Sequence, residues 1–173
     1  MSSSSAPATV EHVDLNRYMG KWYEIARLPT WFERGCENVS AEYSITTHTP
    51  HIGDIRVRVL NQCTTGDLKP QKAEGEARVV DLQTCAKLQV SFLPSFLAYF
   101  MPIFPSSGNY WILNLDTVSY SWAMVGNPEK TCLWVLSRVP YLDPLTYRFL
   151  MGEAVAKGFD VSRMILTQHQ GFP

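Results

Sequence analysis

The chain has 173 residues, of which 46% are hydrophobic and 18% charged, and its formal net charge is −1. This composition excludes an intrinsically disordered protein. No run of Lys and Arg marks a nucleic-acid surface, so we expect no nucleic-acid partner. The length favours a single domain with its own core. Its 8 Phe, 8 Tyr and 5 Trp exceed what such a core requires, so they either pack a β-protein or contact an apolar ligand.

The N-terminal segment is rich in Ser, Ala and Pro, and we predict a flexible tail over residues 1–12 followed by one domain over 13–170. The segment has no apolar stretch typical of a signal peptide. We therefore expect a cytoplasmic protein, or one associated with a membrane from the inside, unless a leader has been removed from a secreted protein. No apolar run is long enough for a transmembrane helix.

Short segments of alternating hydrophobicity, separated by turn signals, predict antiparallel strands. In one of them, Ile55, Val57 and Val59 alternate with Arg56 and Arg58, which indicates one buried and one solvated face. The predicted strands are Trp22–Arg27, Asn38–Thr46, Asp54–Asn61, Ala73–Val80, Ala86–Phe92, Tyr110–Asp116, Ser119–Val125 and Cys132–Arg138. Turns are predicted at 49–53 and 126–128.

After these strands the period changes to that of a helix. Asp143 is a suitable N-cap with Pro144 at the first helical position, and Gly158 is a suitable stop with Phe159 after it. A short final strand is expected at Met164–Gln168. The stripe expected to pack on the outside of the sheet consists of Tyr147, Leu150, Met151, Ala154 and Val155.

Together these elements predict an all-β fold, an eight-stranded antiparallel up-and-down β-barrel with one C-terminal amphipathic α-helix and a short final strand. Closure of the barrel removes exposed strand edges that would promote aggregation. The interior of an eight-stranded barrel is either filled by side chains or holds one small ligand. The periodicity leaves both alternatives open.

Three motifs, in order, resemble the signatures of the lipocalin family. The first is the G-x-W-Y motif at Gly20 and Trp22. Leu115-Asp116 with Tyr120 resembles the second signature, and Leu136-Ser137-Arg138 resembles the third. The resemblance implies that Gly20, Trp22, Asp116 and Arg138 are structural, with Arg138 stacked on Trp22 in a cation–π contact at the closed end of the barrel.

Longer stretches are similar to one group of lipocalins. Phe32–Gly35 and Leu133–Arg138 resemble the bacterial lipocalin, and Val59–Gln62 and Tyr110–Leu113 resemble apolipoprotein D; plant temperature-induced lipocalins share this layout. The resemblance covers about Val13–Gln168. It implies a barrel that is open at one end and carries or stores fatty acids, lysophospholipids or similar lipids, in membrane lipid maintenance or stress protection.

Period-two alternation selects inward positions as candidate ligand contacts, although each of them also fits an ordinary core residue. The hydroxyls of Tyr43 and Tyr110 and the indole N–H of Trp134 are the polar groups on offer to a ligand. Arg34 at the mouth is either a counter-ion for a carboxylate or a solvated loop charge. The candidate ligand-binding residues are Tyr43, Val57, Val59, Leu88, Val90, Phe92, Tyr110, Ile112, Trp134 and Leu136.

The segment 93–108 is apolar, and the resemblance implies that it lies at the open end. Three interpretations remain open: the segment is a lid, a transient membrane contact or a dimer interface. Because the third would make a dimer, we expect either a monomer or a homodimer. The residues that define this mouth loop are Phe96, Tyr99, Phe100, Met101 and Phe104.

Placed on the barrel, Cys36, Cys63 and Cys132 lie near the open end and Cys85 near the closed end. We therefore expect at most one disulfide, among the first three, since a bond needs Cα atoms within about 7 Å. Together with the absence of a visible leader, this favours a reducing compartment.

A second class of function is a lipid-modifying or redox-active lipocalin, either isomerase-like or scavenging lipid hydroperoxides through Met101. A nucleophilic thiolate needs an activating base, and no His is predictably placed beside a Cys. The His spacings do not match a metal site. We therefore expect a binding protein with no catalytic residue, no cofactor and no metal.

Overall fold

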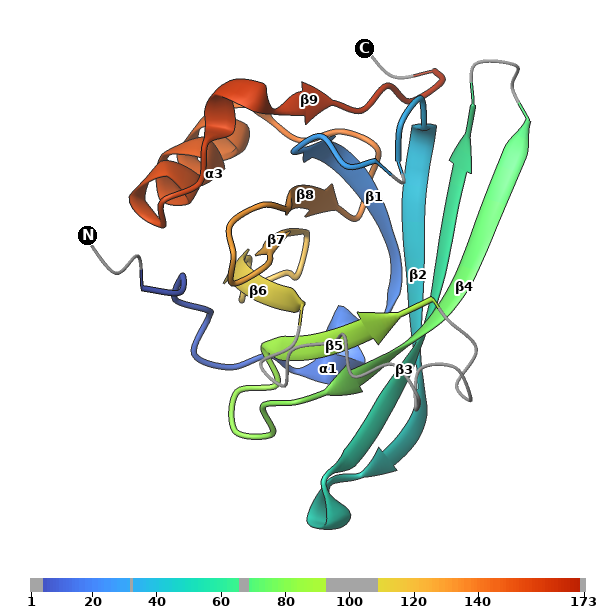
Figure 1. Ribbon diagram of the computed structural model, residues 1–173, viewed down its shortest axis with the longest axis vertical. Helices are drawn as coiled ribbons and strands as arrows, with labels where there is room; N and C mark the ends of the chain where they lie inside the picture. The colour runs from blue at the N-terminus through green and yellow to red at the C-terminus, as the bar shows by residue number, and fades with distance from the viewer. Residues whose placement is uncertain (1–4, 32, 66–68, 93–108, 172–173) are drawn as a thin grey trace.

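The strands form one antiparallel sheet that closes on itself, as Figure 1 shows. The computed structural model describes residues 5–31, 33–65, 69–92 and 109–171. The strand order is β2-β3-β4-β5-β6-β7-β8-β1-β9, and an additional pairing between β2 and β1 closes the barrel. The predicted eight-stranded barrel with an extra short strand and one C-terminal helix is therefore confirmed.

All predicted strands are present, although some of their ends differ from the prediction. β7 begins at Trp122 rather than Ser119 because 117–121 forms a turn. The elements in chain order are α1 Leu15–Tyr18, β1 Gly20–Arg27, β2 Glu37–Thr49, η1 Pro50–Ile52, β3 Asp54–Thr64, β4 Pro70–Val79, β5 Lys87–Ser91, β6 Tyr110–Leu115, β7 Trp122–Gly126, β8 Leu133–Ser137, α3 Pro144–Ala156, η2 Val161–Arg163 and β9 Ile165–Leu166.

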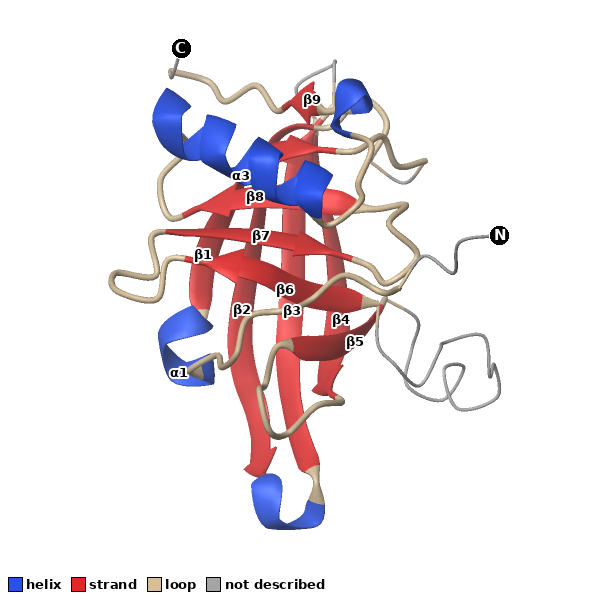
Figure 2. Cartoon of the chain, turned by 90° about the vertical axis from the view of Figure 1, so that its left-hand side faces the viewer, coloured by secondary structure: helices blue, strands red, loops and turns tan. Residues whose placement is uncertain are grey.

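β2 and β3 form a long hairpin that extends beyond the neighbouring strands and has η1 at its tip (Figure 2). The turn predicted at 49–53 is this 3-10 turn. Gly53 ends it with a φ of 73°, a left-handed conformation that glycine adopts without strain, and its N–H donates to Pro50 O at 3.0 Å.

The N-terminal segment runs along the barrel before β1. Pro7 is buried, the N–H of Val10 donates to Ile112 O at 3.0 Å, and that of Val13 donates to Thr84 O at 2.8 Å. Part of the segment expected to be a tail therefore packs on the barrel. Asp14 then caps α1, a short helix absent from the sequence-based prediction.

The helix α3 lies across the outside of the barrel, as the view in Figure 2 shows. Asp143 accepts hydrogen bonds from Leu145 N and Thr146 N, which confirms the predicted N-cap. At the other end Gly158 has a φ of 89°, and Phe159 N donates to Ala154 O at 3.0 Å, as in a Schellman motif.

The stripe of α3 contacts a core outside the barrel. Leu150 and Ala154 are fully buried there, together with residues such as Trp111 and Met124 on the outward faces of β6 and β7. Val155 is 57% exposed, so its place in the predicted stripe was wrong. It lies beyond the edge of the contact, because a helix resting on a convex barrel touches it along a narrow line.

A second, larger core fills the inside of the barrel and includes Trp22, Val57, Val59 and Ile112, all nearly inaccessible to solvent.

Within the described residues, no helix is long and apolar enough to cross a membrane.

Candidate functional site

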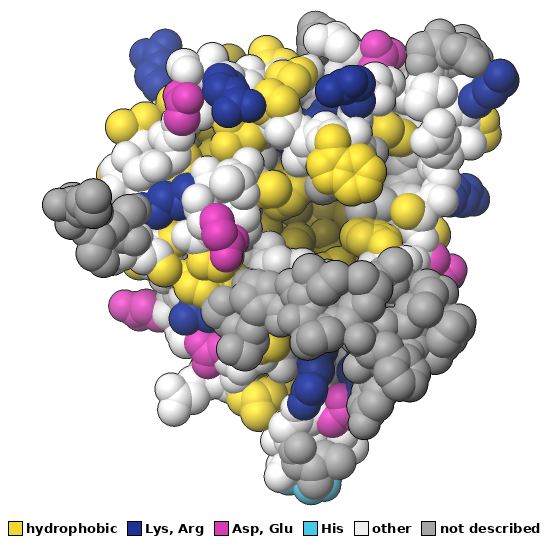
Figure 3. Space-filling view, in the orientation of Figure 1, with side chains coloured by type: hydrophobic (Ala, Val, Ile, Leu, Met, Phe, Trp, Pro, Cys, Tyr) yellow, Lys and Arg dark blue, Asp and Glu magenta, His cyan; other side chains and the backbone are white. Residues whose placement is uncertain are grey.

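The barrel interior is the candidate ligand site. Figure 3 shows a hollow in the face turned to the viewer, with hydrophobic side chains around and inside it. Residues such as Val57 and Val59 are buried, whereas Val90, Tyr110 and Trp134 are only partly buried and pack against the same interior cluster. The partly buried residues are therefore accessible from the hollow, whereas the buried residues fill the interior beneath it.

Most of the predicted ligand-binding residues lie in or against this interior cluster, so their side chains point to one volume. They are Tyr43, Val57, Val59, Leu88, Val90, Tyr110, Ile112, Trp134 and Leu136. Phe92 does not join them: it follows β5 and is 45% exposed. That the clustered residues contact a ligand stays a prediction.

A group of three tyrosines supplies polar atoms inside the barrel. The hydroxyls of Tyr18 and Tyr110 are hydrogen-bonded at 2.8 Å, and those of Tyr43 and Tyr110 at 3.1 Å. Burial raises the pKa of all three, that of Tyr43 to about 12, so they are neutral at physiological pH. Sequence reasoning missed Tyr18 as a residue of the interior. Its side chain reaches the interior from α1, and only Met19 separates it from Gly20, the first residue of the G-x-W-Y motif.

The signature residues meet at the closed end. The guanidinium carbon of Arg138 lies 3.8 Å from the centroid of the Trp22 ring, the contact that the resemblance implied. Arg138 also donates to backbone carbonyls, including Lys21 O at 2.9 Å, and Trp22 Nε1 donates to Tyr18 O at 2.8 Å. Gly20 has a φ of 92°, and a Cβ there would lie 3.4 Å from the Arg138 guanidinium.

Asp116 organises the turn between β6 and β7. Its carboxylate accepts hydrogen bonds from the Ser121 hydroxyl at 2.5 Å and from backbone N–H groups including that of Val118 at 3.2 Å. These bonds, opposed by partial burial, leave the pKa of Asp116 lowered. Tyr120 in this turn accepts a hydrogen bond from Asp14 N at 3.0 Å, which ties the turn to α1.

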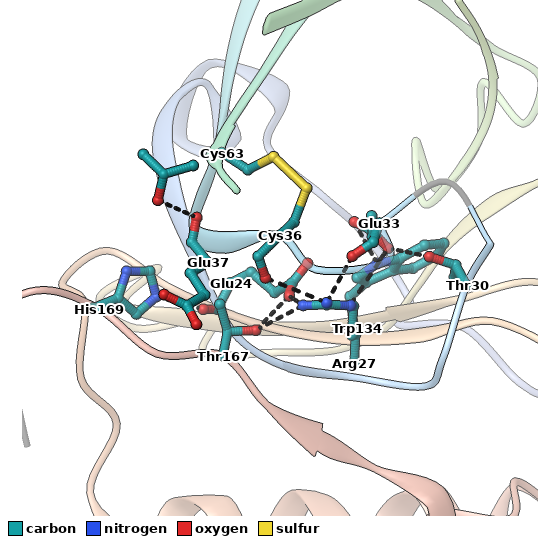
Figure 4. A network of polar contacts seen from close by, with 11 residues as sticks. Glu24, Arg27, Thr30, Glu33, Cys36, Glu37, Cys63, Trp134, Thr167 and His169 are labelled. Atoms are coloured by element: carbon teal, nitrogen blue, oxygen red, sulfur yellow. Dashed lines mark hydrogen bonds and ion pairs between the residues drawn. A yellow bond between two sulfur atoms is a disulfide. The ribbon is translucent and has the colours of Figure 1, made fainter. Parts of the chain in front are cut away.

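A charged network occupies the other end of β1, as Figure 4 shows. Arg27 Nη1 donates to Glu24 Oε1 at 2.5 Å, and its Nη2 donates to Glu33 O at 2.9 Å. The Glu33 carboxylate accepts from Trp134 Nε1 at 3.2 Å and from the Thr30 hydroxyl at 2.6 Å. The network thus joins the β1–β2 connection to an aromatic side chain of the barrel interior.

Glu24 is the most perturbed carboxyl of this network. Burial and the nearby Glu33 charge raise its pKa to about 7, although Arg27 and the Thr167 hydroxyl act against the rise. The ring of His169 is also close, with Nε2 2.7 Å from Glu24 O. None of these residues was singled out from the sequence, since separate strands and loops bring them together.

Cys36 and Cys63 form a disulfide that joins the start of β2 to the end of β3 (Figure 4). The expectation of at most one bond among Cys36, Cys63 and Cys132 agrees with this pair. This disulfide nevertheless counts against the reducing compartment inferred from the sequence, because such bonds persist mainly in oxidising compartments.

The free thiols among the described residues are those of Cys85 and Cys132, both partly buried. Burial raises the pKa of Cys85 and of Cys132, which disfavours the reactive thiolate. Among the described residues, no group of His, Cys, Asp and Glu could hold a metal ion. Phe96, Tyr99, Phe100, Met101 and Phe104 of the predicted mouth loop lie outside the described residues.

The fold and the site define a class: a closed antiparallel β-barrel with an apolar, aromatic interior and a helix on its outer wall. The sequence matches the family model described as a lipocalin-like domain over residues 13–169. The chain therefore belongs to the lipocalin family, whose members bind small hydrophobic ligands.

Relatives cover nearly the whole chain. It is 33% identical to temperature-induced lipocalin-1 of Arabidopsis thaliana over 100% of this chain and 88% of the relative. It is 36% identical to the outer membrane lipoprotein Blc of Escherichia coli strain K12 (94% and 82%) and 30% identical to apolipoprotein D of Macaca fascicularis (100% and 86%).

Solved structures show the same fold at low identity. Lobster apocrustacyanin A1 matches with a TM-score of 0.64 at 14% identity, over 99% of this chain and 94% of that one. Insecticyanin of the tobacco hornworm Manduca sexta matches with a TM-score of 0.59 at 18% identity, over 96% and 85%.

Proposed function

We propose that the protein binds single-chain lipids, such as fatty acids and lysophospholipids, in the barrel interior and carries or stores them. The observation that carries this proposal is the distribution of polarity along the barrel. The interior is apolar with neutral tyrosine hydroxyls. The buried Glu24 and Arg27 and the partly buried Glu33 gather at the end of β1 away from Trp22. An amphiphile with a long chain and one polar head matches that distribution.

The energetics favour an acyl chain over a compact polar ligand. Each buried methylene contributes roughly 0.8 kcal/mol, and ordering the chain opposes part of this gain. Each of the three hydroxyls of Tyr18, Tyr43 and Tyr110 already has a hydrogen-bond partner within the group, so an apolar chain end beside them leaves none of these oxygens without a partner.

The relatives support a role in membrane lipid maintenance or stress protection. One is named an outer membrane lipoprotein and another a temperature-induced lipocalin. The Cys36–Cys63 disulfide favours an oxidising compartment over the cytoplasmic location expected from the sequence. Intact-mass analysis of protein from its native source, with and without reductant, tests the compartment: a fully reduced protein would contradict this preference.

Native mass spectrometry of freshly purified protein tests the binding function directly. We expect a bound species whose mass matches a fatty acid or a lysophospholipid and which an organic solvent extracts. Protein that carries no lipid and takes up none from added fatty acid or lysophospholipid would overturn the proposal.

A pair of identical substitutions locates the site. Val90→Trp places a large side chain into the partly exposed interior, and Val118→Trp places the same side chain in the turn between β6 and β7, where Val118 is 82% exposed. We expect only Val90→Trp to weaken lipid uptake, with circular dichroism showing that both variants fold. Equal binding by both variants would exclude the barrel interior.

Transient membrane contact through 93–108 is also part of the proposal, and the apolar sequence of that segment supports it. Flotation with lipid vesicles compares the wild type with a Phe100→Ser, Phe104→Ser double variant. We expect the variant to lose vesicle binding, whereas retained binding would contradict a membrane role of this segment.

A further inference from the structure

A separate pocket of about 400 Å³ lies between the β1–β2 connection and the segment that joins α3 to β9. Three guanidinium-bearing residues line it, namely Arg27, Arg34 and Arg163, together with the exposed indole of Trp31. The one carboxylate in its lining belongs to Glu33. The wall of this pocket therefore carries an excess of positive charge.

The Glu33 carboxylate is engaged away from the two outer arginines. It accepts hydrogen bonds from Trp134 Nε1 at 3.2 Å and from Thr30 Oγ1 at 2.6 Å. Among the residues that the structure describes, no carboxylate lies within ion-pair distance of Arg34 or Arg163. Asp160, close in sequence to Arg163, interacts with it only at longer range.

Arg27 has one buried donor atom that no hydrogen bond uses, although its other nitrogens donate to Glu24 and Glu33. Its side chain is only 6% exposed, yet its Nε has no hydrogen-bond partner among the described residues and lies 3.9 Å from Glu33 Oε2. A buried charged donor without a partner is costly. An anionic oxygen in the pocket that Arg27 lines would give Nε the hydrogen-bond partner that the described residues do not supply.

We propose that this pocket binds a phosphate group, carried by the head of a lysophospholipid whose chain lies in the barrel or by a small soluble phosphate. Guanidinium groups present paired N–H donors that match phosphate oxygens. Glu33 lines the pocket and accepts a hydrogen bond from Trp134, which packs against the interior cluster. For the lipid form of the proposal we place the head in the pocket and the chain beside that cluster. Only the lipid form of this inference rests on the proposed function.

The lipid arm compares two ligands of equal chain length, lysophosphatidic acid and the neutral monoacylglycerol. We expect the wild type to prefer the phosphate-bearing lipid. An Arg34→Gln, Arg163→Gln double variant should bind lysophosphatidic acid about tenfold more weakly and bind monoacylglycerol unchanged. Arg148→Gln, which removes an exposed arginine from α3 outside the pocket, is the control and should change neither affinity.

A second arm uses inorganic phosphate and the arginine Nε–H signals in NMR spectra, and it does not require lipid binding. We expect saturable shifts of the Arg27, Arg34 and Arg163 signals, which the double variant loses for Arg27. If these shifts occur and neither lipid binds, the pocket stands and the lipid function fails. Two results would overturn the site, each together with absent shifts. One is that the double variant binds both lipids equally more weakly, and the other is that the wild type shows no preference for the phosphate-bearing lipid.

Discussion

Trp22 and Glu24 illustrate how two inward residues of one strand carry different roles. Trp22 is fully buried beneath Arg138 at the closed end and has its indole N–H satisfied by a backbone carbonyl. Glu24, two positions further along β1, is buried beside Arg27. The first side chain stabilises the barrel through packing, and the second makes stability depend on pH.

We expect Trp22→Ala to lower the free energy of unfolding by about 3–5 kcal/mol, because it removes a large buried side chain and leaves a cavity. Urea denaturation followed by circular dichroism measures this change. Trp31→Ala is the matched control: that indole is 84% exposed, and its removal should cost under about 0.5 kcal/mol. Equal stability of Trp22→Ala and wild type would contradict the structural role of Trp22.

The raised pKa of Glu24 predicts a specific pH dependence. Its folded-state pKa is about 7 against an ordinary value of 4.5, so between these values the folded protein binds a proton that the unfolded chain releases. The stabilisation from that proton is complete below pH 4.5 and is lost as the pH rises through 7. Asp81 and Asp116, with lowered pKa values, act in the opposite direction and only in more acidic solution.

Urea denaturation between pH 5 and pH 8 checks this prediction. We expect stability to decrease over that range in the wild type and to decrease much less in Glu24→Gln, which keeps a hydrogen-bonding side chain but does not titrate. The same slope in both would show that Glu24 does not titrate there.

At the scale of elements, the two faces of the sheet belong to different cores. The inner face surrounds the hollow, whereas the outer faces of β6, β7 and β8 pack against α3. Gly126 in β7 allows this close packing, since a Cβ there would lie 2.9 Å from the Phe159 ring. The helix therefore covers the outer wall without contacting the proposed ligand site.

Two residues of α3 test that packing. We expect Leu150→Ala, at a fully buried position, to lower the free energy of unfolding by about 2–5 kcal/mol. Val155→Ala removes apolar atoms from the same helix at an exposed position and should cost under about 0.5 kcal/mol. Thermal denaturation of the two variants compares them, and similar losses would mean that α3 does not pack as described.

The disulfide joins the start of β2 to the end of β3 and so closes the β2–β3 hairpin. Its cysteines are 27 residues apart in sequence, and closing a loop of that length restricts the unfolded chain by roughly 3–4 kcal/mol. We expect a Cys36→Ser, Cys63→Ser variant to melt at a lower temperature in calorimetry and Cys132→Ser to melt near the wild type. An unchanged melting temperature of the double variant would contradict the bond.

At the scale of the whole molecule, the closed barrel couples ligand binding to stability. A ligand that binds only the folded state stabilises it by an amount that depends on its concentration, about 2.7 kcal/mol at a hundred times its Kd. We expect delipidated protein to melt at a lower temperature than protein with added lysophospholipid, and Val90→Trp to show no such shift. A lipid-induced shift in that variant would indicate binding outside the barrel.

The sequence by itself determined the strands, the helix with both of its caps, and the family, because these depend on local periodicity, capping residues and short motifs. It also selected the inward residues Tyr43, Tyr110 and Trp134, since period two separates the faces of a strand. Only the tertiary structure decided which cysteines pair and that Tyr18 joins the tyrosine cluster. The network of Glu24, Arg27 and Glu33 and the arginine pocket beside it likewise depend on contacts between distant segments. Contacts between distant segments leave no periodic signal in any one segment, so the charged end of the barrel could not be predicted from the sequence. The inward aromatic residues could be, because they follow the period of their own strands.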